Sequence, residues 1–157
     1  MYKTKNDLPE KIRADAVAIL NARLADSIDL MHQAKQAHWN VKGPSFIALH
    51  KLFDEIVGAA AKYMDLLAER VVQLGGTAEG TLQAVSKRST LSEYPLHISA
   101  ERDHVEALSN ALAAFGKSAR QAIDHTDQLG DNDSADIFTE ISRGTDQYLW
   151  LVEAHLG

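Results

Sequence analysis

A long run of apolar residues at helical spacing constrains the fold of this chain more than any other feature. The apolar side chains recur every three or four residues between positions 45 and 74, so they share one face of a helix. They are Leu49, Leu52, Phe53, Ile56, Ala60, Tyr63, Met64, Leu67, Val71 and Leu74. The pattern predicts one amphipathic helix over 45–74, which buries this face in its own bundle.

The same helix carries a second band of residues, well away from the centre of the apolar face. At about 100° per residue, His50, Asp54, Asp65 and Glu69 fall within a band about 100° wide. Asp54 and Asp65 are eleven residues apart, which is roughly 16 Å along a helix axis. Carboxylate–metal bonds are only about 2.0–2.6 Å long, so one metal ion cannot bind both on a single helix. Either the band holds two unrelated half-sites, or a second copy of the helix completes each one.

The numbering favours completion by a second copy. Two antiparallel helices related by a two-fold axis between Ala59 and Ala60 place residue i opposite residue 119 minus i. The facing pairs are then Asp54 with Asp65 and His50 with Glu69. Small residues at 58–61 let the two backbones approach closely. The alternative is a solvated acidic face, but the symmetry and the presence of Ile47 and Val72 in the band favour two identical histidine–carboxylate sites per dimer.

A set of short motifs extends over nearly the whole chain. They are His38-Trp39-Asn40-Val41-Lys42-Gly43, Phe46, Leu49-His50, Phe53-Asp54-Glu55, Asp65, Ala68-Glu69-Arg70, Val72–Gly76, Asp136–Phe138 and Leu149–His155. With these motifs the chain strongly resembles the Dps family, the DNA-binding proteins from starved cells, which are ferritin-like mini-ferritins. The resemblance implies a ferroxidase centre between subunits. One subunit gives His38, His50 and Asp54, and its mate gives Asp65 and Glu69. Trp39 lies beside the centre, with a redox or a packing role.

The remaining pattern predicts an all-α domain over 9–157, preceded by a short polar tail at 1–8. Further helices are expected at about 9–38, 97–126 and 134–155, and Ser45 is a candidate cap of the helix over 45–74. The connection of roughly twenty residues before Pro95, with a short helix near Leu82–Val85, is too long for a hairpin loop. Such a crossover makes the second and third long helices parallel, as in a ferritin-like four-helix bundle. The resemblance implies assembly into a hollow dodecameric shell.

The overall composition restricts the function further. The chain has no cysteine, so disulfides and thiolate ligands do not apply. It shows no signal peptide or membrane span, which favours the cytoplasm, with association to the nucleoid as a further option. The net charge of −6 argues against a globally basic nucleic-acid surface and suits attraction of cations.

Three acids, Asp131, Asp136 and Glu140, gather at the start of the last helix. They have two interpretations. Acids in a first turn complement the helix dipole. In Dps-like shells, acids at matching positions line a three-fold pore that draws in cations, and these three fit that pattern.

The resemblance implies that Fe²⁺ is oxidised, with hydrogen peroxide as the preferred oxidant, and stored as ferric mineral, which protects against oxidative damage. Imidazole and carboxylate ligands suit Fe²⁺, Mn²⁺ or Zn²⁺. The alternative function is DNA binding and protection, with weak phosphate contacts through Lys3, Lys5, Lys11 and Arg13. A structural assembly with a vestigial site is a third option. A di-iron enzyme would need paired Glu-x-x-His motifs, but only Glu101 and His104 have that spacing. The histidines without partners are expected to be surface or structural: His32, His97, His104, His125 and His155.

Overall fold

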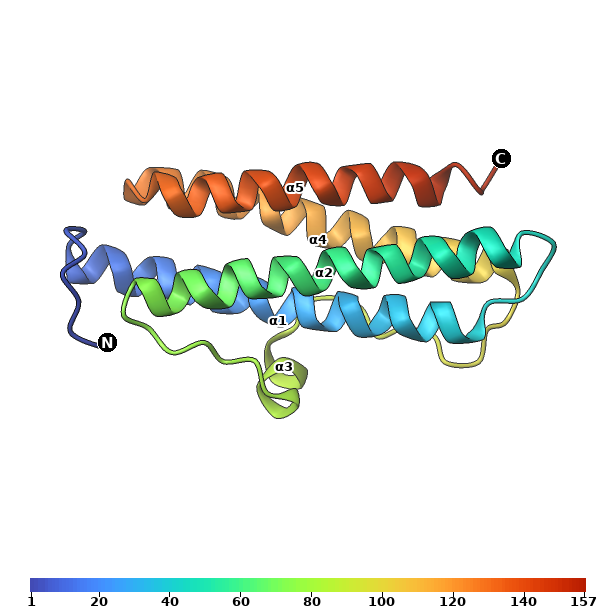
Figure 1. The fold of residues 1–157 in the computed structure, drawn as a ribbon, viewed down its shortest axis with the longest axis horizontal. Coiled ribbons are helices and arrows are strands. Elements are labelled where there is room, and N and C mark those ends of the chain that lie inside the picture. Colours follow the sequence, from blue (N-terminus) through green and yellow to red (C-terminus); the bar gives the residue numbers. More distant parts are fainter.

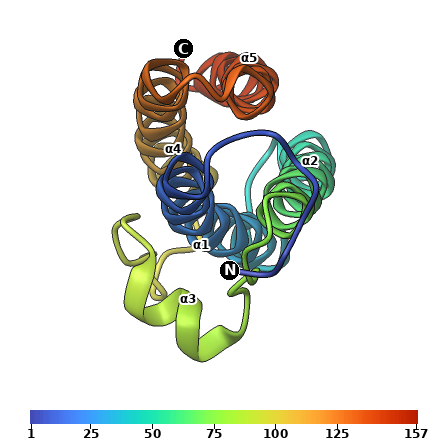
Figure 2. The same cartoon turned by 90° about the vertical axis from the view of Figure 1, so that its left-hand side faces the viewer.

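The computed structural model describes residues 1–157 and contains five helices and no strand. The four long helices are α1 (Glu10–Asn40), α2 (Phe46–Gln73), α4 (Glu101–Leu129) and α5 (Asn132–Glu153), and the short helix is α3 (Leu82–Arg88). Helices α1 and α2 form one antiparallel hairpin, α4 and α5 form another, and the two hairpins pack into a four-helix bundle (Figures 1 and 2). The predicted all-α bundle is therefore confirmed.

The core forms where the apolar faces of the four long helices meet. Leu24 of α1, Phe53 of α2, Phe115 of α4 and Phe138 of α5 are all buried there. The apolar stripe predicted for α2 is buried except for Leu52 and Met64, which are only partly buried and pack against the edge of the core. None of the helices combines the length and the apolar character needed to cross a membrane.

The crossover from α2 to α4 returns along the length of the bundle, so that α2 and α4 run in the same direction (Figure 1). This confirms the predicted ferritin-like connection. Buried Asp26 of α1 holds the crossover, because its carboxylate accepts hydrogen bonds from the Thr90 N–H at 2.7 Å and from the Thr90 hydroxyl. Burial raises the pKa of Asp26 above its ordinary value of 3.8.

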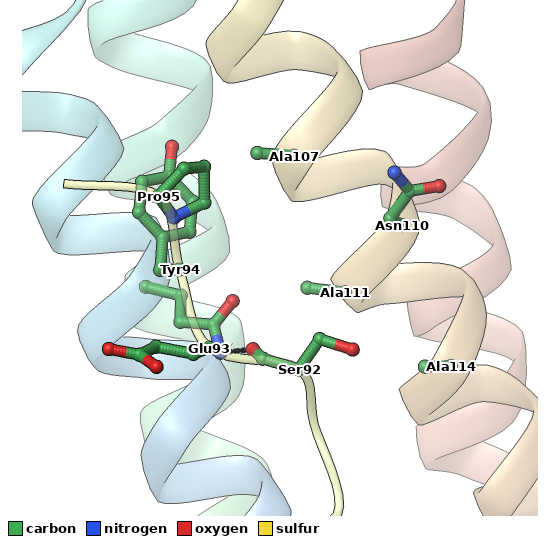
Figure 3. Close-up of a pocket in the computed structure, with 9 residues that line it drawn as sticks. Ser92, Glu93, Tyr94, Pro95, Ala107, Asn110, Ala111 and Ala114 are labelled. Carbon is green, nitrogen blue, oxygen red and sulfur yellow. Dashed lines mark hydrogen bonds between the residues drawn. The ribbon is translucent and has the colours of Figure 1, made fainter. Parts of the chain in front are cut away.

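A small pocket of about 190 Å³ lies between crossover residues 92–95 and α4 (Figure 3). Ala107, Ala111 and Ala114 form part of its wall, and the Gln33 amide closes it by donating to the Ser92 carbonyl at 3.0 Å. None of the predicted metal ligands lines this pocket. The chemistry expected from the sequence therefore lies elsewhere.

The turn between α1 and α2 is bonded to the start of α4. Lys42 exchanges backbone hydrogen bonds with Ser99 and Glu101, and the Glu101 carboxylate accepts the Ser45 N–H at 2.9 Å. The Ser45 side chain makes no capping hydrogen bond, so the expected cap is wrong and Glu101 satisfies this end of α2 instead. A side chain on Gly43 would collide with that carboxylate, which accounts for the glycine. These contacts fix where α1 ends and α2 begins, beside the candidate site.

Candidate metal centre

The α1–α2 hairpin brings two of the predicted ligands, His38 and His50, into direct contact. Their rings stack with centroids 3.7 Å apart and planes 21° from parallel. His38 Nδ1 lies 2.7 Å from the His50 carbonyl oxygen, and His50 Nδ1 lies 2.9 Å from the His38 carbonyl oxygen. A carbonyl can only accept a hydrogen bond, so each Nδ1 carries the proton and donates. The two residues thus hold one another by a reciprocal pair of hydrogen bonds.

Because Nδ1 of each neutral imidazole carries the proton, Nε2 of each ring is unprotonated. An unprotonated ring nitrogen is the form that binds a metal, and the hydrogen bond made by the other nitrogen sets the ring's orientation. Phe46 adds a further constraint, because its ring packs against His50 with centroids 5.1 Å apart. The sequence identified both histidines as candidate ligands, but only the packing of the α1–α2 hairpin shows that they bond to one another.

The third ligand predicted for this half of the site, Asp54, is exposed on α2 one turn beyond His50. Its Oδ1 accepts a hydrogen bond from the Lys35 ammonium at 2.5 Å. Lys35 lowers the pKa of Asp54 below its ordinary value of 3.8, and the charges of His38 and His50 act in the same direction. Sequence reasoning missed Lys35. Lys35 precedes His38 by three residues and so shares its face of α1, but this spacing does not show that the face meets Asp54.

The other two predicted ligands, Asp65 and Glu69, lie on the second half of α2 and are exposed. Within one subunit, no three histidine, aspartate or glutamate side chains come close enough together to hold a metal ion. One chain therefore presents two separate groups of the predicted ligands, one where α1 meets the first half of α2 and one on the second half of α2.

The outer face of α2, which carries His50, Asp54, Asp65 and Glu69, faces away from the core. Ile47 is 59 % exposed and Val72 is 55 % exposed, near opposite ends of the helix. Gly58 is exposed between them. The prediction that this band does not line its own bundle is confirmed. Trp39, which is 66 % exposed, follows His38 at the end of α1, and its redox or packing role stays a prediction.

At the start of α5 the structure separates the three predicted pore acids. Asp131 is only 1 % exposed. Its carboxylate accepts from Arg70 Nη2 at 2.7 Å and from the Ser134 hydroxyl and N–H, which caps α5. Asp131 is therefore not free to line a pore from this subunit, because its oxygens are bonded inside the bundle. Of the two interpretations, Asp131 fits the one in which an acid stabilises the start of the helix, because it is the N-cap of α5.

The other two acids lie at the surface or close to it. Asp136 is exposed, and Glu140 pairs with Lys62 of α2 at 2.7 Å. Their place in a pore stays a prediction.

The basic residues considered for DNA binding also differ in whether they are buried or exposed. Arg13 is buried and donates to the Leu8 and Leu74 carbonyls, so its expected phosphate contact is wrong: its guanidinium stabilises the end of α2. Lys3 and Lys5 are exposed. The tail that carries them is bonded to the rest of the chain, because the Tyr2 N–H donates to the Gly75 carbonyl.

His104, the histidine of the lone Glu-x-x-His spacing, has a structural place. It is buried, and its Nδ1 lies 2.7 Å from the Tyr94 hydroxyl. Burial lowers the pKa of His104 below 6.5. This site therefore holds a neutral core histidine, as expected for the histidines without ligand partners.

Comparisons with known proteins agree with this fold. A family model described as a ferritin-like domain matches residues 17–157. The DNA protection during starvation protein of Agrobacterium fabrum is 49 % identical over 155 residues, covering 99 % of this chain and 96 % of that protein. The protein of the same name from Brevibacillus brevis is 32 % identical, over 88 % of this chain and 92 % of the relative.

Solved structures show the same likeness. The tetragonal form of Mycobacterium smegmatis Dps superposes with a TM-score of 0.93 at 30 % identity, covering 98 % of this chain and 94 % of that one. Dps from Microbacterium arborescens, in its high iron form, gives a TM-score of 0.88 at 32 % identity, covering 98 % and 97 %. With the bundle, the crossover and the matched length in agreement, the chain belongs to the ferritin-like Dps family.

Proposed function

We propose that this chain is a cytoplasmic ferroxidase and iron-storage protein. His38, His50 and Asp54 of one subunit and Asp65 and Glu69 of its partner bind Fe²⁺ together. The observation that carries the proposal is the reciprocal hydrogen bonding of His38 and His50, which leaves Nε2 of both stacked rings available to a metal ion, one helical turn before Asp54 on α2. Membership of the Dps family supports it, as does the uncovered face of α2.

The proposed dimer follows from the exposed groups on α2. Two antiparallel copies would bring Ile47 of one subunit beside Val72 of the other at each end, covering apolar surface that one chain leaves open. Gly58 presents no side chain at the crossing, so the helices can approach closely. Asp65 and Glu69 of the partner would then complete the ligand set, because a single chain brings no three such side chains together. We propose twelve copies in the complete shell.

The donor set suits the proposed chemistry. Imidazole nitrogens bind Fe²⁺ well, and carboxylate oxygens increasingly favour iron as it becomes Fe³⁺. Two Fe²⁺ ions each give up one electron, and together these cleave the O–O bond of one hydrogen peroxide molecule, which with two protons leaves as two water molecules. The ferric product then hydrolyses and grows as mineral inside the shell. Asp136 and Glu140 would attract incoming cations.

Mixing two inactive variants tests the shared site. His38→Ala and Asp65→Ala should each slow Fe²⁺ oxidation strongly while the shell still assembles, and the double variant should do the same. In co-refolded mixtures of the two single variants, each mixed dimer regains one intact site and has one doubly damaged site. Half of randomly formed dimers are mixed, so about a quarter of the parental rate should return.

The matched control is Asp124→Ala with His125→Ala, an exposed acid and histidine on α4. It should oxidise iron at the parental rate. If the mixture stays as inactive as each variant alone, Asp65 does not act across the interface. If the His38→Ala/Asp65→Ala variant oxidises iron at the parental rate, the ligand assignment is wrong.

DNA protection is the second candidate function. The names of the curated relatives and the exposure of Lys3 and Lys5 favour it. The bonded tail and the buried Arg13 reduce the cations available for phosphate. We expect weak binding that disappears at raised salt, measured by gel shift with the full chain and with a chain lacking residues 1–8. Binding that is unchanged without those residues would exclude the tail as the contact.

A further inference from the structure

Lys35 contacts the candidate metal centre without belonging to its ligand set. Its ammonium lies 2.5 Å from Asp54 Oδ1, and the two residues come from different helices, α1 and α2. The contact is partly exposed on both sides, so water and ions can reach it. A lysine ammonium has three donors and no lone pair, and cannot itself bind a metal. Its ammonium donates to the Asp54 oxygen to which a metal ion would bind.

An ion bound at Asp54 would meet this ammonium in two ways. It would compete for the Oδ1 lone pairs that Lys35 now occupies. It would also be repelled by a unit positive charge within a few ångströms, an interaction that partial exposure weakens but does not remove. Three carboxylates, Asp54, Asp65 and Glu69, contribute the negative charge of the completed site, so one lysine offsets about a third of it.

We propose that Lys35 is a positioning residue that holds the Asp54 carboxylate in place before iron binds and must be displaced when a divalent ion reaches that oxygen. This proposal rests on the function proposed above. Lys35 thereby lowers the affinity of the centre for the ion next to Asp54. It also keeps the carboxylate beside His38 and His50 while the centre is empty of metal.

Calorimetric titration with Zn²⁺ alone tests this, because Zn²⁺ accepts the same ligands and is not oxidised. Lys35→Met keeps an unbranched side chain of nearly the same length and removes its charge. We expect the association constant for Zn²⁺ to rise about fivefold, the scale of an exposed ion pair that no longer needs breaking. Lys35→Arg, which keeps the charge, should stay near the parental value.

Lys11→Met is the matched control, because Lys11 forms a similar exposed pair with Asp15 on the same helix. It should leave Zn²⁺ affinity unchanged. In an Asp54→Asn background, Lys35→Met should lose most of its effect, since the competition is for that carboxylate. An equal rise in both backgrounds would show a general charge effect and overturn the proposal, as would no rise with Lys35→Met.

The titration separates failure of this inference from failure of the proposed function. If the parental protein binds Zn²⁺ and loses it with His50→Ala, but Lys35→Met changes nothing, only the role of Lys35 is refuted. If the parental protein and its His50→Ala variant bind Zn²⁺ equally, the metal centre itself is refuted, and with it this inference.

Discussion

The acidic residues in two regions that both involve α2 differ in their burial and in their bonding partners. On its outer face, Asp65 and Glu69 are exposed and Asp54 has a single lysine partner. Where its last turns meet α5, Asp131 is buried and bonded to Arg70 and Ser134. The difference arises because α5 covers one region, whereas no element of the same chain covers the other. An acid is available as a ligand only where its own subunit leaves it uncovered.

The largest expected effect tests the buried region. Asp131→Ala leaves the Arg70 guanidinium, 6 % exposed, without its buried charged partner. Breaking a buried ion pair from one side costs about 3–5 kcal/mol, because the remaining charge stays buried and uncompensated. Urea unfolding at a fixed subunit concentration measures the loss.

Asp133→Ala serves as its control. Asp133 lies 3.7 Å from Arg70 Nη2 but is 84 % exposed, so its removal should change the free energy of unfolding by less than about 0.5 kcal/mol. If the two variants were equally stable, the buried Asp131–Arg70 pair would contribute no more to stability than the exposed Asp133 does. Arg70→Met with Asp131→Leu removes both charges and should recover most of the loss.

A smaller effect extends the comparison to histidines. Burial lowers the pKa of His104, so between that folded value and 6.5 the unfolded chain carries the additional proton. Stability should therefore fall as the pH falls through this window, by at most about 1.4 kcal/mol per pH unit for one proton. Urea unfolding of the parent and of His104→Gln between pH 7.5 and pH 5 measures it.

His104→Gln will itself lower stability by weakening the contact with Tyr94, so the slopes are compared and the absolute values are not. The variant should show a shallower dependence on pH than the parent. Identical slopes would mean that His104 takes up its proton equally well when folded. His125→Gln, an exposed histidine on α4, should keep the parental slope.

The smallest effect is expected on the uncovered face. Asp65 has no ion-pair partner in its own subunit, and in the proposed dimer it faces a like charge, the Asp54 of the other copy. Asp65→Ala, measured without iron, should leave the free energy of unfolding unchanged or raise it by up to about 1 kcal/mol. If the free energy of unfolding instead fell by about 2 kcal/mol or more, Asp65 would have a structural partner, and the proposed difference from Asp131 would be wrong.

Much of the fold could be predicted from the chain because helical periodicity is local. The stripe from Leu49 to Leu74 reports burial directly, and the long crossover indicates parallel α2 and α4. His38 and His50 were also predictable as candidates from their motif. Lys35, by contrast, was missed, because its contact with Asp54 depends on how α1 and α2 pack side by side.

The residue order alone therefore specified four long helices and a band of ligand-type side chains on α2, since both depend on spacing within one helix. Burial of Asp131 and Arg13 depended on packing, because their partners, Arg70 and the Leu74 carbonyl, are 61 residues away along the chain. Spacing places side chains on a face of a helix. Which element covers that face, and which charge lies opposite, is settled only when distant segments come together.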